Sequence, residues 1–148
     1  MTYYLLLTLH LLGATIWVGG HIVLAAAILP RALGRRDPAI VRDFESGFEW
    51  IGLPALFLQA GTGVWLSYYW LPRFGTWFAL DSTISRLIVL KLALLVVTIL
   101  IALHARLRII PRLDAARLPA LAVHIVLVTI LSIAFVVVGV GIRTRGFL

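Results

Sequence analysis

The chain has 148 residues, of which 62% are hydrophobic and only 13% are charged, and its formal net charge is +7. This composition excludes an ordinary soluble domain and indicates an integral membrane protein, whose first partner is the lipid bilayer. The sequence contains no cysteine, which excludes disulfides, thiolate metal sites and iron–sulfur clusters. Any bound metal ion must therefore use nitrogen or oxygen ligands.

Four apolar segments follow one another along the chain, at about residues 3–29, 50–70, 86–105 and 118–142. Each has about the 20 residues that an α-helix needs to cross a bilayer core of about 30 Å. We therefore expect one all-α domain over residues 1–148, an integral membrane four-helix bundle. The first segment lacks a basic leader and is followed by Pro30 and Arg31, so we expect a retained span and not a signal peptide.

The second helix is expected to begin well before its apolar part. Asp37 followed by Pro38 is typical of a helix start, where aspartate caps free N–H groups and proline fits the first turn. Such a helix projects from the bilayer and carries Glu45 and Glu49 to the membrane surface. The third helix is expected to begin at a cap supplied by Asp81, Ser82 or Thr83.

The arginines predict the orientation in the membrane. Eight of them flank the first and third loops, and four lie on the opposite side. The positive-inside rule then places these two loops in the cytoplasm and both termini in the periplasm, as for a multi-pass protein of the bacterial inner membrane. The loop arginines account for the net charge, so we expect no nucleic-acid partner.

Four histidines lie in or beside the apolar segments, where imidazole is costly to bury without a partner. His10 and His21 are eleven residues apart, which on an ideal helix is about 20° of rotation and about 16 Å of rise, so they share one face at two depths. Because the spans alternate in direction, His10 and Lys91 are expected in an outer layer. His21, His104 and His124 are expected in a cytoplasmic layer that Glu49 approaches.

We expect His21 and His124 to form the principal pair, which His104 or Glu49 completes as a metal site. Other roles compete with this one. His21 and His124 can instead form hydrogen bonds between helices, Lys91 can extend its amine to the outer interface, and Glu49 can pair with a loop arginine. His104 can be a solvated interfacial residue, since it lies about 140° around an ideal helix from Lys91 and both are not expected to face inward.

Two cofactor chemistries suit these residues. Two imidazoles on different helices are able to hold the iron of haem b from both sides. Two or three imidazoles with a carboxylate or water suit copper(II) or zinc, whereas copper(I) favours the sulfur ligands that are missing here. No nucleophile–base pair or phosphate-binding loop is recognisable, which disfavours hydrolytic enzymes.

Several short runs resemble the membrane domain of the bacterial copper-resistance D (CopD) family. These runs are Trp17-Val18-Gly19-Gly20, Leu29-Pro30-Arg31, Leu90-Lys91-Leu92-Ala93-Leu94 and Arg106-Leu107-Arg108-Ile109-Ile110-Pro111-Arg112-Leu113. The resemblance covers most of the chain. It implies a four-span inner-membrane domain in copper transport, delivery or tolerance, with a periplasmic copper carrier as a potential partner.

A weaker likeness is to the HemJ-type protoporphyrinogen oxidases, which are small four-span proteins associated with haem. His10 with Trp17, and Lys91 with His104, stand at places similar to those of that family. The likeness implies a haem-dependent membrane oxidoreductase in which His10 and Lys91 are the positions to test. The sequence between Arg31 and Pro54 departs from the pattern.

Three functional hypotheses follow. The first is copper handling by intramembrane histidines. The second is a b-type haem protein that carries electrons between quinone and an acceptor or oxidises a porphyrinogen, and the third is a non-catalytic membrane assembly subunit. Helix faces rich in glycine and alanine are compatible with an oligomer.

Overall fold

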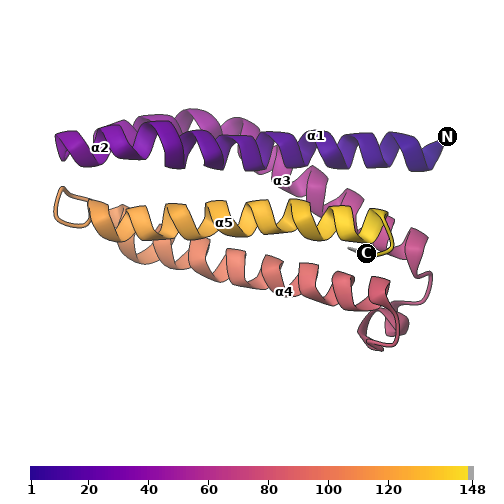
Figure 1. Cartoon of the computed structure of the whole chain (residues 1–148). Coiled ribbons are helices and arrows are strands. Elements are labelled where there is room, and N and C mark those ends of the chain that lie inside the picture. The colour runs from indigo at the N-terminus through magenta and orange to yellow at the C-terminus, as the bar shows by residue number, and fades with distance from the viewer. Residues whose placement is uncertain (147–148) are drawn as a thin grey trace.

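The structure, a computed structural model, describes residues 1–146 and is built from helices alone over that range. The five α-helices in chain order are α1 (Thr2–Val23), α2 (Leu29–Arg35), α3 (Ala39–Trp70), α4 (Thr83–His104) and α5 (Leu118–Arg143) (Figure 1). This architecture confirms the predicted all-α fold.

Three helical rods are long and apolar enough to cross a membrane. α1 and α2 are joined through a π-helical segment into one rod of 34 residues, Thr2–Arg35. α4 is extended in the same way to give a rod of 30 residues, Thr83–Arg112, and α5 has 26 residues. These rods contain the first, third and fourth predicted spans.

α3 is long enough to cross a bilayer but less apolar than the three rods. It runs without a break for 32 residues and contains Pro54. Its start agrees with the expectation from the sequence, because Pro38 occupies the cap position and the Asp37 carboxylate accepts a hydrogen bond from the Ala39 N–H at 3.0 Å. The crossing of the membrane by residues 50–70 stays a prediction.

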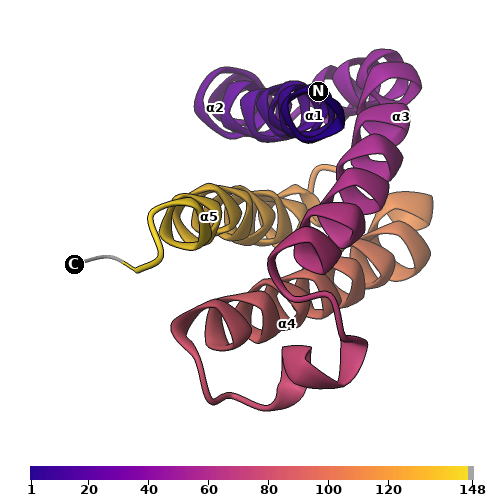
Figure 2. The same ribbon diagram turned by 90° about the vertical axis from the view of Figure 1, so that its right-hand side faces the viewer.

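The helices pack as two pairs. α1 lies along α3 and α4 lies along α5, and α5 also contacts α1. The end-on view in Figure 2 shows the two pairs, with α1 above α5 and α3 crossing from the first pair toward the second. The α3–α4 and α1–α5 sides are therefore the less closely packed sides of the bundle.

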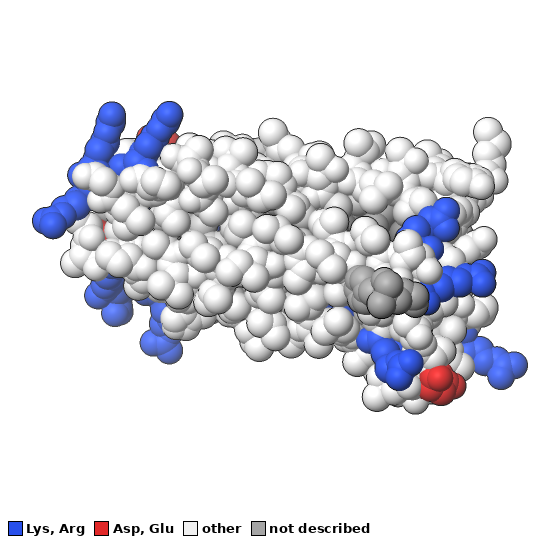
Figure 3. Space-filling model, in the orientation of Figure 1, with Lys and Arg blue, Asp and Glu red and all other residues white. Residues whose placement is uncertain are grey.

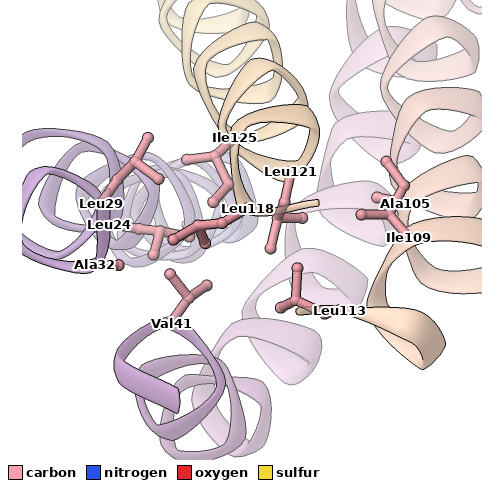
Figure 4. Packing of buried hydrophobic residues seen from close by; sticks show 10 residues of the cluster. All are labelled: Leu24, Leu29, Ala32, Val41, Ala105, Ile109, Leu113, Leu118, Leu121 and Ile125. Atoms are coloured by element: carbon pink, nitrogen blue, oxygen red, sulfur yellow. The ribbon is translucent and has the colours of Figure 1, made fainter. Parts of the chain in front are cut away.

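The hydrophobic core is concentrated at one end, which we call the core end. There Leu118 and Leu121 of α5 are 1% exposed, and Val41 at the start of α3 is completely buried. Figure 4 shows these side chains among others from the α1–α2 rod and from the α4 rod. The opposite end, called the termini end, carries the N-terminus, the end of α5 and the loop between α3 and α4 (Figure 1).

Charged side chains gather at both ends of the face shown in Figure 3, and the band between them is uncharged. This distribution is that of a protein whose middle lies in hydrocarbon and whose ends reach the headgroups. The assignment of the core end to the cytoplasm, with both termini in the periplasm, stays a prediction.

Candidate functional site

His10 and Lys91 meet in the half of the bundle nearer the termini end. His10 is 8% exposed, and its Nε2 lies 3.4 Å from Lys91 Nζ. On the other side of the ring, Nδ1 lies 3.0 Å from both the Gln59 carbonyl oxygen and the Thr62 hydroxyl oxygen. The structure thus brings together the two residues that the depth of their positions predicts to be neighbours.

The hydrogen bonds define which nitrogen of His10 carries the proton. The Thr62 hydroxyl donates its own proton to the Leu58 carbonyl oxygen at 2.6 Å, so its oxygen is free to accept. Both partners of His10 Nδ1 are therefore acceptors, and Nδ1 carries the proton. The lone pair of Nε2 faces the Lys91 amine.

Two cavities in the bundle share this pair of residues in their walls. The larger, of about 560 Å³, lies between α1 and α5, and the smaller, of about 100 Å³, lies between α3 and α4. His10, Gln59, Gly63 and Lys91 line both. Each of the two less closely packed sides of the bundle therefore has a cavity that reaches His10 and Lys91.

A second pair of histidines lies toward the core end. His104 Nδ1 is 2.9 Å from His124 Nε2, and the two ring planes are within 16° of each other. His124 Nδ1 lies 2.8 Å from the Ala120 carbonyl oxygen and must donate to it. His124 Nε2 therefore accepts the hydrogen bond, and His104 Nδ1–H donates it.

His124 thus pairs with His104 and not with His21, in contrast to the arrangement expected from the sequence. On α5, Thr129 faces α1, where its hydroxyl lies 3.2 Å from the His21 carbonyl oxygen. His124 is five residues earlier and therefore about 140° around the helix, which turns it away from α1 and toward α4.

His21 occupies an aromatic setting of its own. Its Nδ1 donates to the Trp17 carbonyl oxygen at 2.8 Å, and its ring lies 4.5 Å from the Trp17 ring and 6.2 Å from the Phe48 ring, centroid to centroid. The hydrogen bond and the ring contacts give His21 the surroundings of a packed structural residue.

The acidic residue expected to complete a metal site is paired with an arginine. Glu49 and Arg106 form an ion pair at 2.6 Å on the surface. Burial raises the pKa of the nearby Glu45 carboxyl, with Arg106 opposing that rise and Glu49 adding to it. Within residues 1–146, no three histidine, aspartate or glutamate side chains are grouped closely enough to hold a metal ion.

Neither the His104–His124 pair nor the His10–Lys91 pair has the geometry of a haem with two axial histidines. Two axial nitrogens lie about 4 Å apart across the metal if each metal–nitrogen bond is about 2.0 Å. His104 and His124 instead share one hydrogen bond at 2.9 Å, and the companion of His10 is a lysine. The structure gives haem b no support at these positions.

Sequence reasoning missed some residues that shape these sites. Thr62 is one of the two acceptors for His10, and Gly139 lies next to the Lys91 amine. Thr62 is three residues after Gln59, so the helical period of α3 contained a signal for its position. The closeness of Gly139 to Lys91 had no comparable signal, because it depends on how α4 and α5 pack together.

Comparison with known protein families shows to which family the chain belongs. The family model for copper resistance protein D, CopD, matches residues 42–142, which is well over half of the chain. The chain belongs to the CopD family. The search of curated proteins found no match, and the search of solved structures found none either.

CopD membership and the three apolar rods make this a multi-pass membrane protein of a copper-resistance family. The matched region contains α4 and nearly all of α3 and α5, so Lys91, His104, His124 and Glu49 lie inside it. His10 and His21 lie before it. The likeness to HemJ-type oxidases stays a hypothesis.

Proposed function

We propose that this CopD-family protein handles copper as cargo and holds Cu(II) between His104 Nδ1 and His124 Nε2. The observation that carries the proposal is the separation of 2.9 Å between these two nitrogens. With metal–nitrogen bonds of about 2.0 Å, neighbouring ligands of a square-planar ion are about 2.8 Å apart, and those of a tetrahedral ion about 3.3 Å. The separation of the two nitrogens therefore matches that of neighbouring ligands of a square-planar Cu(II) ion.

The protonation states also suit a metal ligand pair. The Ala120 carbonyl holds the proton of His124 on Nδ1, so that Nε2 presents its lone pair. Copper would take the place of the proton that the two rings share, and that proton would move to His104 Nε2. Both rings then remain neutral, as ligands to a cation must be.

Two protein ligands suit a site that accepts an ion and passes it on. The remaining positions of Cu(II) would be taken by water or by donor groups of a copper carrier, because Glu49 is held by Arg106 two residues beyond His104. The only sulfur atom in the chain is that of Met1, which disfavours a copper(I) site.

The Lys91 amine makes His10 a poorer copper ligand. It lies 3.4 Å from Nε2, the only nitrogen of His10 with a free lone pair. A protonated amine at this distance repels a metal cation in surroundings of low dielectric constant. This contrast supports the pair at the core end as the proposed copper site.

Titration of the detergent-purified protein with Cu(II), followed by electron paramagnetic resonance, tests this assignment. We expect hyperfine structure from two imidazole nitrogens, and a loss of affinity of about a hundredfold in His104→Ala and in His124→Ala. His21→Ala is the matched control, since it removes an imidazole outside the pair, and it should bind copper like the wild type. Equal copper binding by all four proteins would contradict the proposal.

A further inference from the structure

The larger cavity, between α1 and α5, has a polar centre but no acid in its wall. Its charged lining residues are Lys91 and Arg143, and its uncharged polar ones include His10 and Gln59. Within residues 1–146 the one salt bridge joins Arg106 to Glu49, so no carboxylate of the described chain faces the Lys91 amine at ion-pair distance. The cavity therefore presents cationic groups within apolar walls.

Space is left open directly beside these groups. A Cβ added at Gly139 would lie 3.6 Å from Lys91 Nζ, and one added at Gly63 would lie 3.2 Å from Cε1 of His10. Glycine at these two positions leaves both polar side chains accessible from the cavity. A larger residue at position 139 would occupy the space next to the amine.

We infer that this cavity binds an amphiphile with a carboxylate headgroup beside Lys91 Nζ and an apolar tail between α1 and α5. A buried ammonium without a counter-ion is strongly unfavourable, and a carboxylate in the cavity removes that cost through a charge-assisted hydrogen bond. His10 Nε2 carries no proton and accepts from the Lys91 amine, and the Gln59 side chain is a further polar neighbour of the headgroup site. The volume of about 560 Å³ accommodates a headgroup and part of a chain.

The depth of the site favours a fatty acid over a phospholipid. Lys91 is eight residues from the start of α4 and His10 is eight from the start of α1, so both lie about 12 Å along their helices from the termini end. A lipid phosphate remains near the surface, where Arg143 lies at the end of α5. A carboxylate that enters sideways from the bilayer reaches Lys91 with its tail still in hydrocarbon.

Quenching of tryptophan fluorescence by dibromostearic acid tests this inference on the detergent-purified protein, because Trp70 lines the cavity. We expect saturable quenching by the acid at concentrations about tenfold or more below those needed for its methyl ester, which has the same tail without the charge. In Lys91→Met the acid should bind no better than the ester. Arg86→Met, which removes an exposed cation of α4 outside the cavity wall, should preserve the preference.

Gly139→Leu should abolish the saturable quenching by filling the space beside the amine. Equal binding of the acid and the ester by the wild-type protein would overturn the inference without the need for any variant. Tight binding of decylubiquinone that depends on Lys91, in place of the acid, would show that the site takes a neutral acceptor and would also overturn it. Quenching by a brominated phospholipid that depends on Arg143 and not on Lys91 would also overturn the inference.

The copper titration is independent of this outcome, because neither His104 nor His124 lines the cavity.

Discussion

At the scale of single residues, the contact between α1 and α3 depends on glycines that make room for one aromatic ring. Phe48 lies between Gly20 of α1 and Gly52 of its own helix. A Cβ added at Gly20 would lie 2.2 Å from Phe48 Cζ, and one added at Gly52 would lie 2.6 Å from Cε1. The ring also stacks on Phe44, at 5.7 Å between centroids, so it has little space into which to move.

Gly20→Ala is therefore expected to weaken the packing of α1 on α3. Relative to Gly19→Ala, it should lower the free energy of unfolding by about 1 to 3 kcal/mol, because overpacking displaces Phe48. Gly19 is the matched control, since its Cβ would meet nothing within 4 Å and both changes gain the same helix propensity. Unfolding in detergent, followed by circular dichroism, measures the difference.

A double-mutant cycle separates this contact from other effects of the substitution. In a Phe48→Ala background the cost of Gly20→Ala should disappear, because the clashing ring is gone. An unchanged cost in that background would show that the contact with Phe48 is not its cause.

The partners of His10 and His124 show what the sequence can and cannot predict about single residues. Span direction and depth were sufficient to place His10 beside Lys91. They did not give the partner of His124, because its position on the helix circumference depends on how α5 is rotated. One signal was present in the sequence, since His104 and His124 are each ten residues from Asp114 in the loop between α4 and α5. Equidistant residues of a helical hairpin lie at the same level.

At the scale of elements, the start of α4 is held by two serines with different roles. Ser82 caps the helix, with its hydroxyl oxygen 3.2 Å from the Ser85 N–H. Ser85 is completely buried, donates to the Trp77 carbonyl oxygen at 2.9 Å and accepts from the Leu80 N–H at 2.9 Å. It thereby fixes a loop in which Leu80 has the left-handed backbone angle φ 57°.

Ser85→Ala is expected to destabilise the protein more than Ser82→Ala. Loss of the cap costs about 1 kcal/mol. Loss of Ser85 leaves a carbonyl and an N–H of the loop without their partner and should cost about 2 to 3 kcal/mol. Thermal unfolding of the two variants in the same detergent compares them directly, and an equal or larger effect of Ser82→Ala would show that the loop does not depend on Ser85.

The limits of helices were predictable where a local chemical signal exists. Asp37 and Pro38 correctly indicated that α3 begins far ahead of its apolar part, and Ser82 was among the residues expected to cap α4. The π-helical segments Leu24–Ile28 and Ala105–Ile109 had no such signal. They extend the α1–α2 and α4 rods into the buried cluster at the core end, so their geometry depends on tertiary packing.

At the scale of the whole molecule, composition and hydropathy were sufficient to predict an all-helical membrane protein. The packing of the helices into two pairs was not predictable from them, because apolar residues surround most of each helix and hydropathy alone does not define its neighbour. The orientation rests on the distribution of arginines between the two ends, which predicts that the core end lies in the cytoplasm.

The absence of cysteine from the sequence makes this orientation directly measurable. We expect Gly75→Cys, in the loop between α3 and α4, to react with a membrane-impermeant maleimide in intact spheroplasts. Ala115→Cys, in the loop between α4 and α5, should react only after the membrane is opened. Both positions are exposed, so a difference in labelling reports the side of the membrane. The reverse pattern would invert the topology, and labelling of both positions in intact spheroplasts would contradict it.

The concentration of the buried core at one end means that the two ends of the bundle are held together to different degrees. The cluster around Leu118 and Leu121 joins the two arms, α1 with α3 and α4 with α5, while the opposite end is divided by the cavity. Separating the arms at the core end would expose most of this cluster, whereas the opposite end contains the cavity. The helices are therefore expected to be held together more firmly near His104 and His124 than beside the cavity.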